Sequence, residues 1–111
     1  MRRLIPLLLL ALGACQGNDP HAQAKALIAS RCAACHVVPG VRTAVGVVGP
    51  PLADIANRQV IAGKFANNRD NLVRWIMHPQ AMMPGSAMPE MGISQPQATQ
   101  IADYLRTLDK P

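Results

Sequence analysis

The sequence has very few aromatic residues. It contains one Phe, one Trp and one Tyr among 111 residues, although half of the residues are hydrophobic. A chain of this length forms one domain and has no room for a separate substrate domain. The apolar content argues against disorder. Because large rings usually fill much of a core, their shortage indicates that something other than side chains occupies the middle.

Acidic residues are also scarce, and basic residues are not clustered. Six Asp and Glu stand against eleven Lys and Arg, a formal net charge of +5. Without Arg2 and Arg3 at the extreme N-terminus, nine basic and six acidic residues leave +3. No basic run exceeds two residues, so we predict no nucleic-acid partner. The mild basic excess suffices to steer an acidic protein partner.

The longest hydrophobic run, residues 4–12, is too short to span a bilayer as a stable helix. It follows a short positive segment, Met1-Arg2-Arg3, and this order is typical of an export signal. The run ends in Leu12-Gly13-Ala14-Cys15, which resembles the lipobox of bacterial lipoproteins. In a lipobox, small residues admit the signal peptidase and the following thiol takes a diacylglyceryl group.

We therefore predict three segments: a lipoprotein signal peptide at 1–14, the lipidated Cys15 with a short tether at 15–19, and the folded domain at 20–111. The protein would be exported and held at the periplasmic side of the inner or outer membrane by acyl chains on Cys15. The alternative is ordinary cleavage beside Ala14, which would leave a free, reactive cysteine on a secreted protein.

Three segments have the pattern of an amphipathic helix, and no segment alternates long enough to predict a sheet, so the expected fold class is all-α. The first runs from His21 to about Cys32, with Asp19 as its predicted N-cap and Pro20 at the first helical position. The second is predicted at 70–78, capped by Asp70, and the third at 94–108. In the third, Ser94 and Gln97 form a capping box. A short helical turn is expected at 52–58.

The motif Cys32-Ala33-Ala34-Cys35-His36 has the C-x-x-C-H pattern that attaches c-type haem. Two thiols three residues apart at a helix end lie on one side, where each can form a thioether with one haem vinyl group. His36 then lies beside the porphyrin and can reach the iron. We therefore predict one covalent haem c, which would also fill a core that is poor in aromatics.

Two other chemistries use similar cysteine pairs. A thioredoxin-like redox pair would follow a strand, whereas a helix is predicted before Cys32. A zinc site would need a second pair of ligands, for which only Cys15, His21 and His78 remain. Export also favours haem, because c-type haem is attached outside the cytoplasm.

The sixth position of the iron decides the function, and several residues could occupy it. The candidates, besides water, are Met77, Met82, Met83, Met88, Met91, His21 and His78. Prolines at 79, 84, 89 and 96 predict an extended, low-entropy segment that can carry a thioether across the haem. This argument selects the segment rather than one methionine within it.

From about His21 to Leu108 the chain resembles a class I cytochrome c. That family supplies its axial sulfur from a Pro-Gly-(Thr or Ser)-x-Met motif, to which Pro84-Gly85-Ser86-Ala87-Met88 is similar. The resemblance implies that His36 and Met88 are the axial ligands, with Met91 second in order. It also implies a small all-α fold of three main helices and short turns wrapped around the haem.

The same resemblance implies roles for other residues. In Gly49-Pro50-Pro51-Leu52, the Pro50 carbonyl would accept a hydrogen bond from the second ring nitrogen of His36. Arg58 would bind a haem propionate, and so would Ser86. Trp75 would line the methionine side of the haem.

The family's first and last helices also cross closely. The equivalent residues here are Ala24 and Ile28 in the first helix and 101–105 in the last. Ala24 stands where Gly is more usual, and Ile28 where an aromatic is common.

An iron bound by both His36 and Met88 has no vacant site for a substrate, so the sequence predicts an electron carrier and not an enzyme. Its partners would be redox proteins. Two alternatives stay open: a gas-binding or peroxidase-like haem protein with a labile Met88, which His78 could assist, and a haem subunit held permanently by a larger oxidoreductase.

Overall fold

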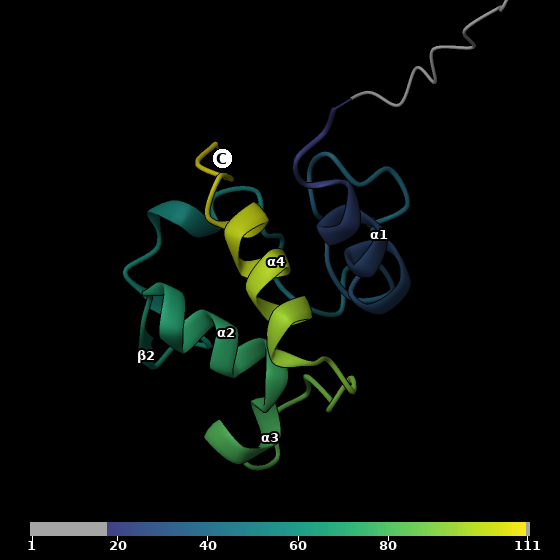
Figure 1. Ribbon diagram of the computed structural model, residues 1–111. Coiled ribbons are helices and arrows are strands. Elements are labelled where there is room, and N and C mark those ends of the chain that lie inside the picture. The colour runs from purple at the N-terminus through teal and green to yellow at the C-terminus, as the bar shows by residue number, and fades with distance from the viewer. Residues whose placement is uncertain (1–17, 111) are drawn as a thin grey trace, which may run out of the picture.

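The computed structural model describes residues 18–110, and the predicted all-α fold with three main helices is confirmed. The main helices are α1 (Ala22–Arg31), α2 (Arg69–Met77) and α4 (Gln95–Leu105). Helix α4 lies between α1 and α2 and packs against both (Figure 1). The predicted signal peptide and Cys15 lie outside the described residues.

Short elements connect these helices. The 3-10 helix η1 (Ile55–Asn57) lies inside the turn expected at 52–58, and the short helix α3 (Pro79–Met82) follows α2. Strands β1 (Val60–Ile61) and β2 (Phe65–Ala66) form an antiparallel pair.

Neither the β1–β2 pair nor α3 was predicted. Each strand has only two residues, too few for a detectable alternation. Pro79 occupies the first turn of α3, where its missing N–H costs nothing, so it begins a helix as well as ending the one before it. The stretch from Pro79 to Pro96 is therefore not extended throughout.

The residues that cap the helix N-termini agree only in part with those predicted from the sequence. Ser94 and Gln97 form the predicted capping box at α4. Helix α2 is capped by Asn68, whose Oδ1 accepts from Asn71 N at 2.8 Å, so the predicted cap at Asp70 was wrong by two residues. Asp19 does not cap α1 either; its Oδ1 accepts from His21 N at 2.8 Å in the preceding turn.

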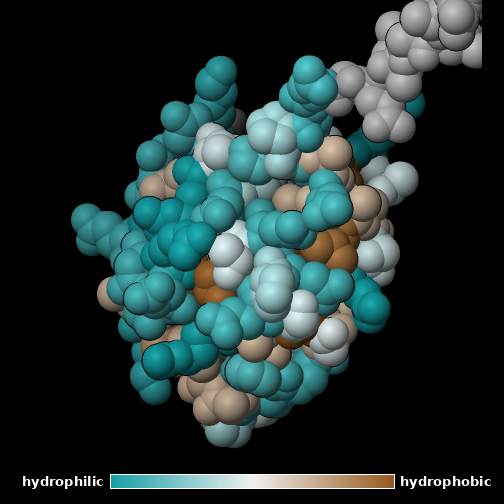
Figure 2. All heavy atoms as spheres, viewed as in Figure 1, coloured by the Kyte–Doolittle hydropathy of each residue, from teal (hydrophilic) through white to brown (hydrophobic). Residues whose placement is uncertain are grey.

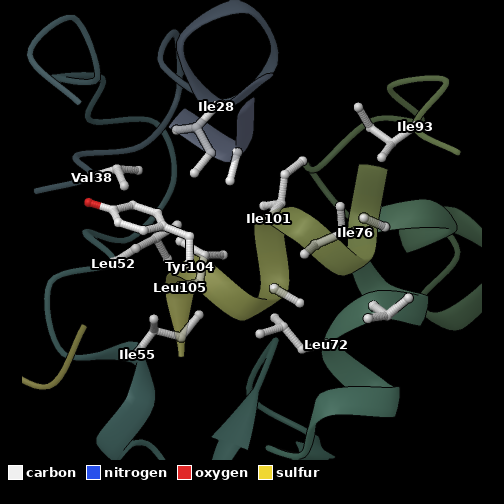
Figure 3. Packing of buried hydrophobic residues seen from close by; sticks show 14 of the residues in the cluster. Ile28, Val38, Leu52, Ile55, Leu72, Ile76, Ile93, Ile101, Tyr104 and Leu105 are labelled. Atoms are coloured by element: carbon white, nitrogen blue, oxygen red, sulfur yellow. The ribbon is translucent and has the colours of Figure 1, made fainter. Parts of the chain in front are cut away.

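The core consists mainly of aliphatic side chains from α1, α2, α4 and the loops, packed on both sides of α4. Ile28 of α1 points toward Ile101, and Leu72 and Ile76 of α2 approach α4 from the other side (Figure 3). Ala24 and Ile28, which were expected at the α1–α4 crossing, are both buried. On the face shown in Figure 2, hydrophilic residues predominate and hydrophobic ones show mainly in recesses between them.

Candidate functional site

The Cys-Ala-Ala-Cys-His motif forms a tight turn directly after α1. The Cys32 N–H still donates to the Ile28 carbonyl at 2.8 Å, as in a helix. The N–H groups of Cys35 and His36 then both donate to the Cys32 carbonyl, at 3.1 and 3.0 Å. The turn therefore joins the two half-buried thiols and the imidazole through backbone hydrogen bonds, and neither thiol forms a disulfide.

The Cys32 side chain packs against the hydrophobic core. Burial, with a smaller contribution from Cys35, raises the pKa of the Cys32 thiol to about 11. The thiol is therefore neutral at physiological pH in the absence of a bond to another group. A neutral thiol suits the apolar surroundings and explains how the cysteine is tolerated there.

The imidazole of His36 is oriented by the loop that follows it. Its Nδ1 lies 2.7 Å from the Pro50 carbonyl oxygen, so the contact expected from the Gly-Pro-Pro-Leu segment is present. A carbonyl oxygen only accepts, so Nδ1 carries the proton of the neutral ring, and in that tautomer Nε2 keeps a free lone pair. Nε2 makes no hydrogen bond to any residue between 18 and 110. A histidine held in this way is prepared to bind a metal through Nε2.

Two glycines let this loop approach the motif closely. Gly46 N donates to Ala33 O at 3.1 Å, and Gly49 N donates to Cys35 O at 2.7 Å. A Cβ atom added at Gly49 would lie within 3 Å of three atoms of the His36 ring. The position requires glycine because of this close approach, since the backbone itself is not in the left-handed region.

Other contacts fasten the same loop to the rest of the domain. The Tyr104 hydroxyl of α4 donates to the Pro39 carbonyl. Arg58 donates to the Pro51 carbonyl, and its guanidinium pairs with Asp54 at 2.7 Å. Arg58 thus lies next to Pro50 on the His36 side of the site. Its bond to a haem propionate stays a prediction.

The Pro84–Met88 segment forms a loop after α3. Ser86 N donates to Met83 O at 3.1 Å, and Met88 N donates to the Ser86 hydroxyl oxygen at 3.2 Å. The Met88 side chain is half-buried. Ser86 therefore shapes the loop that carries Met88, while its contact with a propionate stays a prediction.

One residue of this region was missed by the sequence analysis. The amide of Gln80 in α3 hydrogen bonds to three residues of the methionine loop, Gly85, Ser86 and Met88. No motif marks Gln80, and its partners lie five to eight positions further along the chain. Only the fold of the loop brings them together.

The other candidate ligands lie in different surroundings. His21 packs its ring 5.3 Å from the Tyr104 ring, and exposed His78 lies 3.6 Å from Glu90. Met91 packs against the core, and its carbonyl accepts from Arg31 at 3.1 Å. This last bond links the end of α1, just before Cys32, to the segment after Met88.

Trp75 lies on α2, half-buried against the core, with its ring 6.2 Å from the Phe65 ring. Its place beside the haem stays a prediction. Within residues 18–110, no helix is long and apolar enough to cross a membrane, and no three His, Cys, Asp or Glu side chains gather to hold a metal ion.

The donor set fits a covalently attached haem. Two free thiols and an imidazole share one turn, and the free lone pair of His36 Nε2 is the donor that iron requires. Gly49 leaves the imidazole space that a side chain would take. Cys32, Cys35 and His36 would thus hold the group, and Pro50 would orient its histidine.

Comparisons with known proteins agree with this geometry. The sequence model of the family named Cytochrome c matches residues 21–109. Among curated proteins, the chain is 38% identical over 78 residues to cytochrome c oxidase subunit 2 of Alkalihalophilus pseudofirmus, covering 69% of this chain and 22% of that protein. It is 32% identical over 96 residues to cytochrome c oxidase subunit 2 of Bacillus sp. strain PS3, covering 82% and 27%.

The chain thus spans about a quarter of the length of these relatives. The family match covers the Cys-Cys-His turn, the Pro50 loop and the Met88 loop together. By this match the chain belongs to the cytochrome c family, which implies that it is a haem c domain for electron transfer.

Proposed function

We propose that this protein is an electron carrier with His36 and Met88 as axial ligands of one haem c, anchored at the periplasmic side of a membrane by a lipid on Cys15. When bound, the haem supplies an iron that changes oxidation state by one electron. The hydrogen bond between His36 Nδ1 and the Pro50 carbonyl carries the proposal, because it fixes the ring and frees Nε2 for iron.

Each side of the site has a distinct task. The Pro50 carbonyl accepts a hydrogen bond from His36 Nδ1 and polarises that N–H bond. This polarisation makes Nε2 a stronger donor to a metal. Met88 offers a neutral sulfur, and this ligand favours the ferrous state and raises the reduction potential. Two protein ligands leave no vacant site for a substrate, so electron transfer is the chemistry that remains.

The loop beside the thiols is suited to a protein partner. Val45, Val47 and Val48 are 68, 87 and 75% exposed, although they are large hydrophobic residues. The loop that they form is bonded to the turn of Cys32 and Cys35 through Gly46 and Gly49. An apolar patch at this place fits a redox partner that makes a small, transient contact.

The charge of the segment that contains these valines indicates the kind of partner. Residues 20–53 contain no Asp or Glu, and both Arg31 and Arg42 are exposed there. Exposed valines in a segment that has basic but no acidic residues fit a partner whose docking face carries carboxylates. Such pairing would accelerate association at low ionic strength and weaken with salt.

A second candidate function is supported by the relatives. Both are named as subunits of cytochrome c oxidase, and about three quarters of their length lies outside the match. In this alternative, the chain is a haem subunit held permanently by a larger oxidoreductase. Purification from mild detergent distinguishes the two, because a free carrier elutes alone and a subunit elutes with its complex.

The optical spectrum of the purified holoprotein tests the proposed ligation. We expect a low-spin ferric spectrum with the weak near-infrared band of a sulfur-to-iron bond, and no response of the ferrous form to carbon monoxide. A high-spin ferric spectrum or rapid carbon monoxide binding would mean an open or labile sixth position. The function to pursue would then be gas binding or peroxide chemistry.

The anchor is tested separately with Cys15→Ser. We expect the wild-type protein to fractionate with membranes in high salt and the variant to be released as a soluble, haem-loaded protein. A matched Ser30→Cys variant, which adds an exposed thiol elsewhere, should behave as wild type. Membrane retention of Cys15→Ser in high salt would sink the lipid anchor.

A further inference from the structure

The loop that carries Met88 is held by one glutamine side chain. Gln80 Nε2 donates to the Ser86 carbonyl at 2.7 Å and to the Met88 carbonyl at 2.8 Å. Gln80 Oε1 accepts from the Gly85 N–H at 3.1 Å. Both amide protons and the amide oxygen of one side chain are thus bonded to backbone groups on the methionine loop.

Gln80 is itself well anchored. It follows Pro79, which is buried at the start of α3, and the N–H groups of Met82 and Met83 close that helix on His78 and Pro79. The backbone of Gln80 is also tied to the far end of the loop, because its N–H donates to Glu90 Oε1 at 3.2 Å. The loop is therefore fixed on both sides of Met88 from a single position of α3.

We propose that Gln80 is the positioning residue for Met88, holding the loop in the shape that presents the sulfur before it binds iron. This inference rests on the proposed ligation by His36 and Met88. A thioether carries no charge, so its binding depends strongly on how little conformational freedom is lost when it binds. Gln80 removes that freedom in advance by fixing the backbone at Gly85, Ser86 and Met88.

The three hydrogen bonds require a side chain with an amide group and the length of glutamine. A Glu at position 80 would keep an acceptor for Gly85 N–H but lose both donors to the two carbonyls. A Leu would keep most of the volume and lose all three bonds. The Met88 loop should therefore be held most firmly in the wild type, less firmly in Gln80→Glu and least firmly in Gln80→Leu.

The test compares these variants as holoproteins with Gln95→Leu, a control at an exposed glutamine of α4 whose side chain forms no hydrogen bond within residues 18–110. Three quantities are measured: the intensity of the near-infrared band, the rate of carbon monoxide binding to the ferrous protein, and hydrogen exchange at the Gly85 amide. For Gln80→Leu we expect a weakened band, and carbon monoxide binding and Gly85 exchange each faster by roughly tenfold or more. Gln80→Glu should weaken the band and speed carbon monoxide binding less than Gln80→Leu does, with Gly85 exchange near that of wild type because an acceptor for its N–H is kept. Gln95→Leu should match wild type in all three quantities.

Exchange at Gly85 separates this proposal from the ligation on which it rests. If Met88→Ala keeps the wild-type band, the ligation is wrong, while Gly85 exchange in Gln80→Leu still reports whether the loop is held. If Met88→Ala loses the band but Gln80→Leu keeps the band and resists carbon monoxide, Gln80 does not position Met88 and the proposal is overturned. Should Gln80→Leu fold poorly, Gln80→Glu decides by the near-infrared band and by carbon monoxide binding.

Discussion

The two sides of the site are built in different ways. On the His36 side, the motif turn and the Pro50 loop are joined by backbone hydrogen bonds from Gly46, Gly49 and the turn itself. On the Met88 side, the loop depends on side chains, with Gln80 and Ser86 bonded to its backbone. Backbone bonds form whatever the side chains are, provided that the chain can approach closely enough. The contact between the Pro50 loop and the motif turn should therefore be most sensitive at its glycines, whereas the shape of the Met88 loop should be sensitive to single polar side chains.

The largest expected effect is on the His36 side, at Gly49. In Gly49→Ala, the added Cβ must displace the His36 ring, and we expect a loss of about 3 kcal/mol of stability and a lower yield of haem-loaded protein. The measurement is denaturant unfolding of the haem-loaded protein together with the haem content per chain.

The matched control is Gly63→Ala. Gly63 has a φ of +69° but no atom within 4 Å of an added Cβ, so only backbone strain of about 1 kcal/mol is expected. Haem content should stay normal in this variant. Equal losses in the two variants would show that the close approach of Gly49 to His36 is unimportant.

The Met88 side is broken most directly by Met88→Ala. The cysteines and His36 are untouched, so the haem should stay attached, while the sixth position opens and the ferrous form binds carbon monoxide rapidly. Because the stabilising sulfur is lost, the reduction potential should fall. Met91→Ala is the matched control and should keep the wild-type spectrum; the reverse pattern would make Met91 the ligand.

The difference between the two sides also explains what the sequence could predict. The Cys32–His36 turn and the Ser94 capping box are local patterns in which spacing along the chain determines the geometry. The Pro50 contact, between residues 14 positions apart, was expected only from the resemblance to class I cytochromes c. The cap of α2 was misplaced because Asn68 and Asp70 are both good capping residues two positions apart, and packing of the helix decides between them.

Gln80 could not be found in the same way. Its role depends on the path of the chain from α3 through the Met88 loop, and an isolated glutamine after a proline matches no motif. The β1–β2 pair was missed for a related reason, since two residues per strand carry no periodicity. Side-chain bonds across an irregular loop are set by tertiary structure, which sequence patterns do not report.

A smaller effect is expected where the substitution touches neither side. Ser94→Ala removes the N-cap of α4 and should cost about 1 kcal/mol of stability, with an unchanged spectrum. Ser30→Ala, at an exposed serine that bonds only within its own helix, should cost much less. Thermal unfolding gives the stabilities, and a spectral change in Ser94→Ala would mean that α4 controls the ligand loops.

The smallest expected effect is on the pH dependence of stability, and it comes from the ion pair between Arg69 of α2 and Asp103 of α4. The hydrogen bond from Arg69 lowers the pKa of Asp103 below its usual value. A lowered carboxyl pKa stabilises the fold above the unfolded-state value of about 3.9, and this contribution is lost as the pH falls through the folded-state pKa. Asp103→Asn should therefore flatten the dependence of the melting temperature on pH below about 4.

Because both side chains of this pair are about half exposed, the change should be slight and should shrink at high salt. Asp109→Asn, which removes a carboxylate outside any ion pair within residues 18–110, is the control. A steep pH dependence that survives in Asp103→Asn would assign the acid sensitivity to other carboxyl groups.

The central claim is that His36 and Met88 meet on one iron, and proton NMR of the ferrous holoprotein with labelled methionine methyl groups tests it most directly. A methyl group of an axial methionine lies over the porphyrin, so its resonance is shifted far upfield by the ring current. We predict one such resonance, absent in Met88→Ala and retained in Met91→Ala. The loss of that resonance in Met91→Ala alone, or its absence from the wild-type spectrum, would contradict the account.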